Sequence, residues 1–204
     1  TVSFSSTHLP MDTFWIYIQL GFQHISDITA YDHIVFITAL VAGYKLTEFR
    51  RIVWLVTAFT LGHSGSLALA TLGIIPVNAT LIEFLIPVTI LLTALVNITR
   101  HADKATAGRA WTSYIMATAF GLIHGVGFSN YLQSLLSAEQ SLVVPLLGFN
   151  LGLEMGQLII VVILLTLFFV LRKIAHVKHR SWNLFMSGLS AGVALILIQE
   201  AWPF

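Results

Sequence analysis

Residues 142–171 read LVVPLLGFNLGLEMGQLIIVVILLTLFFVL, an apolar stretch interrupted by one charged residue, Glu154. This stretch is longer than the roughly 20 predominantly apolar residues that a helix needs to cross a bilayer. The whole chain has the same character: of 204 residues, 57% are hydrophobic and 9% are charged, against about 25% charged in soluble domains. The composition predicts an all-α, polytopic integral membrane helical bundle. A net charge of +1 gives no electrostatic footprint for a nucleic-acid partner.

Further apolar stretches predict about six transmembrane helices, or seven if the first segment is split. The expected ranges are 14–44, 52–74, 79–98, 110–130, 142–171 and 182–202. The first range is too long for one upright helix, and polar residues interrupt it. We therefore expect a half-helix at 12–25 followed by a span near 29–44, since irregular backbone at membrane depth is tolerated where protein buries it. Residues 12–204 are expected to form a single transmembrane domain, and residues 1–11 a flexible N-terminal extension.

The cationic residues predict the orientation of the chain. Every lysine and arginine falls in one of three groups, which are Lys45, Arg50 and Arg51; Arg100, Lys104 and Arg109; and Arg172, Lys173, Lys178 and Arg180. Cytoplasmic loops carry an excess of such residues. The pattern predicts that the three loops carrying these groups are cytoplasmic and that both termini lie outside. Tryptophans near the expected span ends agree with an aromatic belt at the membrane interfaces; they are Trp15, Trp54, Trp111, Trp182 and Trp202.

Ionisable residues within membrane spans are costly and usually mark functional sites. The expected spans contain His24, Asp27, Asp32, His33, His63, Glu83, His124 and Glu154. At about 1.5 Å of rise per residue, all of them lie in the middle or outer half of the bilayer. Overlapping depth predicts that they form one shared site.

Neutral imidazole is the commonest metal ligand, and carboxylates complete or orient such sites. Because the chain has no cysteine, the pattern predicts a divalent transition metal ion (Ni, Zn, Co, Cu or Fe) held by histidine and carboxylate. The expected ligands are His24, His33, His63, His124, Asp32, Glu83 and Glu154. Residues expected to support the site or its path are Asp27, Asn150, Gln157 and Ser64. In the alternative interpretation, each histidine only joins two helices by a hydrogen bond.

Five stretches resemble the HupE/UreJ family of bacterial membrane proteins. They are GFQHISDITAYDHIVF (21–36), FTLGHSGSLALATLGI (59–74), IEFLIPVTI (82–90), FGLIHGVGFSNYL (120–132) and LLGFNLGLEMGQLI (146–159). Family members are associated with hydrogenase and urease operons and are regarded as nickel permeases or accessory proteins. The resemblance implies metal handling by the family-motif positions, which are His24, Asp32, His33, His63, Glu83, His124, Glu154 and Gln157.

The leading hypothesis is a nickel-type permease, or a membrane accessory protein for metalloenzyme maturation, rather than an enzyme. Its partners would be the lipid bilayer and the metal ion, with a homo-oligomer or a membrane-complex partner left open. One alternative is an intramembrane zinc-type hydrolase, because three histidines on Zn²⁺ leave an open position for an activated water. Glu154 or Asp32 would then act as general base. Another alternative is an accessory subunit of a larger membrane complex.

The orientation can be tested with single cysteines in this cysteine-free chain. Residues 45–51, 99–109 and 171–181 should be cytoplasmic, whereas residues 75–78 should face outward. We expect an impermeant thiol reagent added to intact cells to label Val77→Cys and to leave Lys104→Cys unlabelled. Labelling of Lys104→Cys would overturn the orientation.

Overall fold

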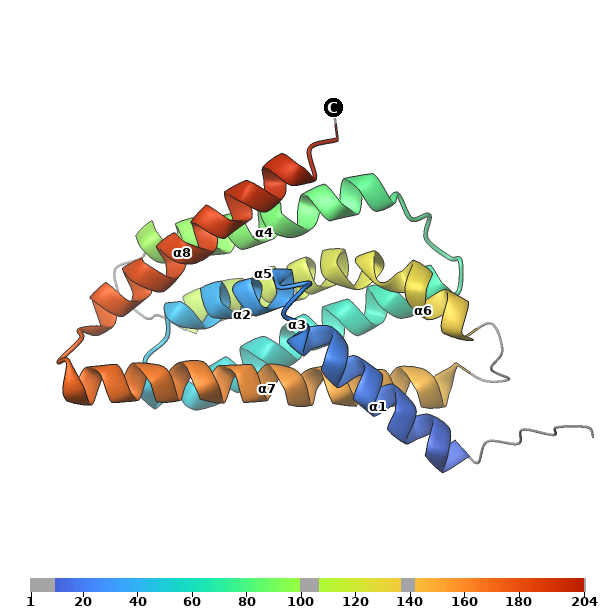
Figure 1. Ribbon diagram of the computed structural model, residues 1–204, viewed down its shortest axis with the longest axis horizontal. Coiled ribbons are helices and arrows are strands. Elements are labelled where there is room, and N and C mark those ends of the chain that lie inside the picture. The colour runs from blue at the N-terminus through green and yellow to red at the C-terminus, as the bar shows by residue number, and fades with distance from the viewer. Residues whose placement is uncertain (1–9, 100–106, 137–141, 204) are drawn as a thin grey trace, which may run out of the picture.

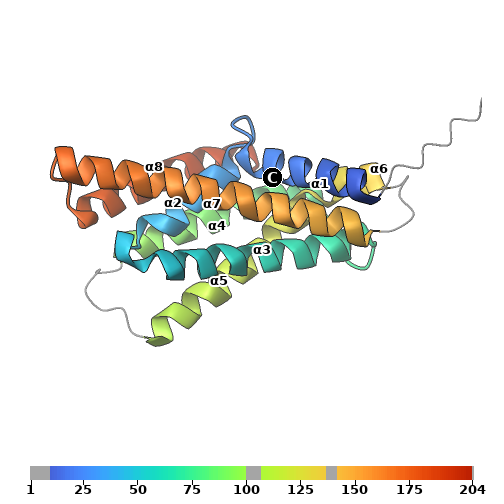
Figure 2. The ribbon, with the colours of Figure 1, turned by 90° about the horizontal axis from the view of Figure 1, so that it is seen from below.

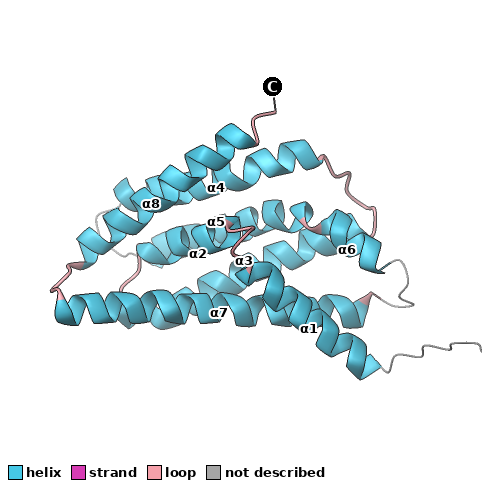
Figure 3. Ribbon diagram, in the orientation of Figure 1, coloured by secondary structure: helices cyan, strands magenta, loops and turns pink. Residues whose placement is uncertain are grey.

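The computed structural model describes residues 10–99, 107–136 and 142–203, and its regular elements are all helical (Figure 3). In chain order they are α1 (Pro10–Ser26), α2 (Asp32–Ala42), the 3-10 turn η1 (Leu46–Glu48), α3 (Phe49–Thr71), α4 (Ala79–Thr99), α5 (Ala107–Gly127), α6 (Ser129–Leu136), α7 (Val143–Ile174) and α8 (His179–Glu200). The predicted all-α class is confirmed. Residues 1–9 of the expected extension, and the cations Arg100 and Lys104, lie outside the described residues.

Four segments within the described ranges are long and apolar enough to cross a membrane: Leu46–Thr71, Ala79–Thr99, Val143–Ile174 and His179–Glu200. The outer surface of the bundle carries many large apolar side chains. Contact with lipid tails stabilises such a surface, whereas contact with water does not. Large exposed side chains include Leu147, Ile163 and Phe185.

Trp182 departs from the predicted aromatic belt, because it is buried and stacks on Phe168 with ring centroids 5.2 Å apart.

The first segment is broken, as the sequence predicts, but neither half is a full span. Helix α1 has 17 residues and α2 has 11, and α2 is therefore only about 16 Å long. The chain leaves α1 where the Asp27 carboxylate accepts hydrogen bonds from the Thr29 amide at 2.8 Å and the Thr29 hydroxyl at 2.7 Å. Such local side-chain bonds compete with helix continuation. The expected loop at 131–141 also differs, since its first residues belong to α6.

Glycines allow two helix pairs to touch backbone to backbone. Helix α1 runs beside α7 (Figure 1), where a Cβ at Gly152 would collide with the carbonyl oxygen of Ile18. Helix α3 lies between α5 and α7 (Figure 2), and a Cβ at Gly125 would collide with the carbonyl oxygen of His63. Small residues at helix interfaces permit this approach in membrane proteins. The backbones that carry His24, His63 and His124 are thereby held close to their neighbours.

The cationic segments that the structure describes share one end of the bundle. The connections 43–48 and 175–178 both lie at the left end of Figure 1. Two hydrogen bonds join the helix ends there: His179 Nε2–H donates to the Tyr44 carbonyl at 2.9 Å, and the Arg180 guanidinium donates to the Ile98 carbonyl at 2.8 Å. The ends of α2 and α4 are thus tied to the start of α8. We call this end of the molecule the cationic end.

The close contact of α1 with α7 makes Gly152 a sensitive position. We expect Gly152→Ala to lower the free energy of unfolding by about 1–3 kcal/mol, the usual cost of overpacking, because the new methyl group meets the backbone of Ile18. The matched control is Gly188→Ala in α8, where an added Cβ meets nothing within 4 Å. Thermal unfolding in detergent measures both variants. Equal melting temperatures for Gly152→Ala and Gly188→Ala would show that the close contact of α1 with α7 does not stabilise the protein.

Candidate metal centre

Four helices bring four histidines together. His24 lies in the last turn of α1, His33 in the first turn of α2, His63 within α3 and His124 near the end of α5. The ring centroid of His33 lies 4.7 Å from that of His24, 6.0 Å from that of His63 and 5.3 Å from that of His124. We call these four residues the histidine cluster. The break in the first segment is what allows His24 and His33 to meet.

The histidine cluster is buried, and several of its ring nitrogens have no partner among the described residues. Exposed fractions are 4% for His33, 0% for His63 and 1% for His124, and His24 is half-buried. Several ring nitrogens have no hydrogen-bond partner among the described residues: His24 Nε2, His33 Nε2, both nitrogens of His63, and His124 Nδ1. Burial of polar atoms without partners is costly. Neutral imidazoles in such an arrangement are suited to bind a transition metal ion.

Threonine 89 determines which nitrogen of His124 can bind a metal. The Thr89 hydroxyl donates to the Ile86 carbonyl at 2.7 Å and lies 2.9 Å from His124 Nε2. A hydroxyl has one hydrogen to donate, so its oxygen accepts a hydrogen bond from Nε2–H. The lone pair of His124 is therefore on Nδ1, the buried nitrogen without a partner. Hydrogen bonds of this kind typically orient histidine ligands.

Asp32 is the carboxylate that the structure places beside the cluster. Its Oδ1 lies 3.2 Å from His33 Nδ1. A carboxylate in this position can accept a hydrogen bond from a ring N–H or bind a metal ion itself.

Two groups of possible ligands emerge, and they overlap at one residue. His24, His33 and His63 form one group, and Asp32, His33 and His124 form the other. Within each group the ligand atoms lie within 4.8 Å of one another, so small side-chain rotations would bring three ligands onto one ion. The sequence predicts one shared site with all four imidazoles around it, and in the structure both groups contain His33.

Phenylalanine rings surround the histidine cluster. Phe128 lies 3.9 Å from the His24 ring, Phe36 lies 4.9 Å from the His124 ring, and Phe59 lies 5.2 Å from it, all measured between centroids. Sequence reasoning missed these residues and Thr89. No signal in one sequence marks them, because phenylalanine and threonine are ordinary residues in any apolar span.

Four other predicted residues form no hydrogen bond with the ring nitrogens of the cluster among the described residues. Asp27 is exposed and bonded to Thr29, and Glu83 is exposed. Asn150 is half-buried with Oδ1 lacking a partner among the described residues. Ser64 is half-buried next to His63, but the hydroxyl that donates to the His63 carbonyl, at 3.2 Å, is that of Ser66.

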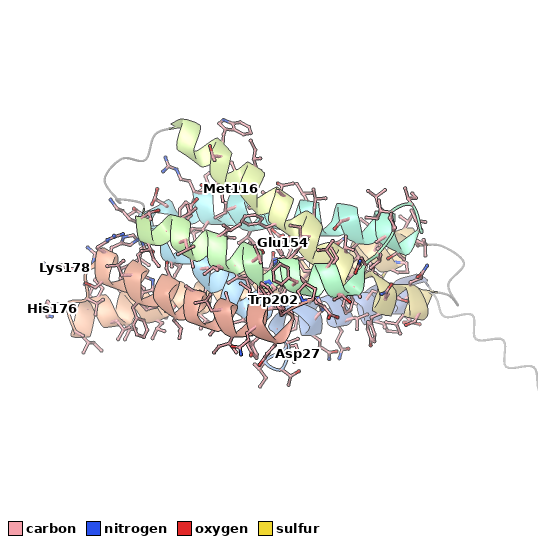
Figure 4. The ribbon with its side chains drawn as sticks, turned by 90° about the horizontal axis from the view of Figure 1, so that it is seen from above. Asp27, Met116, Glu154, His176, Lys178 and Trp202 are labelled. Carbon is pink, nitrogen blue, oxygen red and sulfur yellow. The ribbon has the colours of Figure 1, made fainter. Side chains whose placement is uncertain are left out.

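Glu154 and Gln157 build a separate polar layer between α3 and α7. The Thr57 hydroxyl donates to one Glu154 carboxylate oxygen at 2.6 Å, and the Thr60 hydroxyl hydrogen-bonds the other. Thr60 also lies 2.8 Å from Gln157 Oε1. Figure 4 labels Glu154 near the middle of the length of the bundle. Because Thr60 precedes His63 by one helical turn, this layer, which we call the oxygen layer, lies beyond His63 toward the cationic end.

An open groove lies beside Asp32, between the 27–31 turn, the start of α4 and the end of α8. It has a volume of about 410 Å³ and is lined by three carboxylates, Asp32, Glu83 and Glu200, together with residues of the 27–31 turn. We call it the acidic groove. Asp32 belongs both to the acidic groove and to one ligand group, so this carboxylate connects the groove with the histidine cluster.

Comparison with known proteins identifies the family of the chain. No curated protein and no solved structure matches the chain at a significant level. The family model described as HupE / UreJ protein matches residues 3–202, nearly the whole chain. This is the family that the five sequence stretches resemble. Apolar spans and a buried group of histidines and Asp32 agree with that resemblance. The chain belongs to the HupE/UreJ family.

Proposed function

We propose that this protein is a permease for a divalent transition metal ion of the nickel type, with the histidine cluster as its binding site. The observation that carries the proposal is the convergence of buried ring nitrogens without partners from α1, α2, α3 and α5. Imidazole suits Ni, Zn, Co, Cu and Fe alike, and membership in the HupE/UreJ family favours nickel. The expected ligands are the four histidines and Asp32.

The polar groups on either side of the cluster support passage of the ion. We place the acidic groove on the periplasmic side and the cationic end in the cytoplasm of a bacterial inner membrane, with α1 and α2 together forming one of six crossings. Carboxylates of the acidic groove would attract the hydrated cation. The oxygen layer at Glu154 would receive it beyond His63. Sequence analysis assigns Glu154 to the ligands; its hydrogen bonds to Thr57 and Thr60, one helical turn from His63, support a permease over a dead-end site.

The zinc-type hydrolase remains the second candidate, because His24, His33 and His63 would leave an open position on a bound ion. Such an enzyme also needs a general base near the bound water. Glu154, one expected base, is engaged by Thr57 and Thr60, which favours transport. Reconstituted protein that hydrolyses ester or amide substrates without moving metal would favour the hydrolase.

His33 is the residue on which metal binding should depend most, since it belongs to both ligand groups. We expect His33→Ala to abolish stoichiometric binding of Ni²⁺ or Co²⁺, because neither group then keeps three ligands. Elemental analysis after purification measures the metal content.

The control for this variant is His176→Asn. His176 is exposed in the turn between α7 and α8 and has φ of 52°, a conformation that asparagine tolerates. Its metal content should equal that of the wild type. Full metal content in His33→Ala, with an unchanged elution profile, would leave the histidines as packing residues and the proposal without support.

Glu154→Gln separates a ligand from a path residue, since the amide retains the shape of the carboxylate and loses its charge. We expect metal content to stay at the wild-type level while uptake into proteoliposomes falls at least about tenfold, the lower range for loss of a residue that supports a metal site. Loss of metal from Glu154→Gln would instead make Glu154 a ligand. Unchanged uptake by Glu154→Gln would show that the oxygen layer is not part of the path of the ion.

A further inference from the structure

We infer that the histidine cluster holds two alternative ion positions that share His33, and that one ion occupies them in turn. This inference rests on the proposed function and specifies how the site would pass its ion. The outer position is formed by Asp32, His33 and His124, and the inner position by His24, His33 and His63.

The two positions differ in chemistry. The inner position has three neutral imidazoles, whereas the outer position has two imidazoles and a carboxylate. Asp32 provides negative charge at the outer position only. Its Oδ1 lies 3.2 Å from the nearer ring nitrogen of His33, Nδ1, while His33 Nε2 has no partner among the described residues. With Nδ1–H donating to Asp32, Nε2 is the bare nitrogen of His33, and the same nitrogen can bind the ion in either position.

A shared imidazole limits occupancy to one ion at a time. A neutral imidazole carries one N–H and one bare nitrogen, so His33 can complete either position but not both. Two of the other ligands have neighbours that limit their movement: Thr89 hydrogen-bonds the ring of His124, and the backbone of His63 lies against Gly125. His33, in the first turn of the short helix α2, is the ligand common to both, and it stays bound as the others exchange.

The order of the two positions follows from their neighbours. Asp32 lines the acidic groove, so the outer position is the one that an arriving ion meets first. His63 lies one helical turn from Thr60, which hydrogen-bonds the Glu154 carboxylate and Gln157, so the inner position adjoins the oxygen layer. Stepwise movement thus leads from carboxylates, through nitrogen ligands, to oxygen ligands again.

Cobalt is the probe for the test, because the visible absorption of bound Co²⁺ reports its ligands. Wild-type protein in detergent is titrated with Co²⁺ beside His24→Ala, His63→Ala, Asp32→Asn and His124→Ala. We expect one Co²⁺ per wild-type chain. His24→Ala and His63→Ala should each retain one Co²⁺ with a common spectrum from the outer position. Asp32→Asn and His124→Ala should retain one Co²⁺ with a different common spectrum from the inner position.

Uptake distinguishes two positions in sequence from two independent sites. Each of the four variants should still bind Co²⁺, yet lose uptake into proteoliposomes at least about tenfold, because the ion can no longer change position. Glutamine variants of His63 and His124 replace any alanine variant that does not elute as a single folded species. His176→Asn is the control, with wild-type spectrum and uptake.

Three results would overturn the inference. Loss of all Co²⁺ in both His63→Ala and His124→Ala would show one undivided site. Binding of two Co²⁺ per wild-type chain would contradict alternate use of His33. Wild-type uptake in all four variants would show that no change of position is needed. A wild-type protein that binds no Co²⁺ would overturn the proposed function itself. This result is distinct from the three that overturn only the inference of two positions.

Discussion

Backbone-to-backbone contact through glycine is the interaction on which the rest of this bundle depends. A Cβ at Gly125 would collide with the carbonyl oxygen of His63, and a Cβ at Gly152 would collide with that of Ile18. Apolar side chains gain little from meeting one another in lipid, so close approach and interhelical hydrogen bonds hold such helices together. Because Gly125 follows His124 directly, the contact that joins α3 to α5 also determines how near His124 comes to the rest of the histidine cluster.

The interruption of the first segment has a comparable effect on α1 and α2. His24 and His33 are nine residues apart in the sequence, so a continuous helix would separate them by about 13 Å along its axis. The turn at 27–31, closed by Asp27 and Thr29, instead brings their ring centroids to 4.7 Å. Two short helices are stable here because each packs on a longer one: α1 on α7, and α2 on α4 and α8. The cost of the break is thus balanced by packing elsewhere in the bundle.

The sequence predicts position along a helix well and direction around a helix axis poorly. Hydropathy and the positions of the cations predict the helical ranges, and overlapping depth selects the four histidines that the structure brings together. Depth alone also selects Glu83 and Glu154, but α4 directs Glu83 to the acidic groove and α7 directs Glu154 to Thr57 and Thr60. The stripe from Asn150 through Glu154 to Gln157 follows from helical spacing, whereas the neighbour that it faces depends on packing between distant segments.

The charges along the proposed path indicate how the ion could keep moving. A divalent ion among His24, His33 and His63 would keep its full charge, because these ligands are neutral, whereas Asp32 at the outer position would offset one unit. Charge buried in a medium of low dielectric is costly unless it is compensated. The Glu154 carboxylate, which its two threonine partners orient, is the next anionic group beyond His63. An ion at the inner position therefore lies between two carboxylates, Asp32 behind it and Glu154 ahead, and small changes in helix packing would decide which one attracts it more.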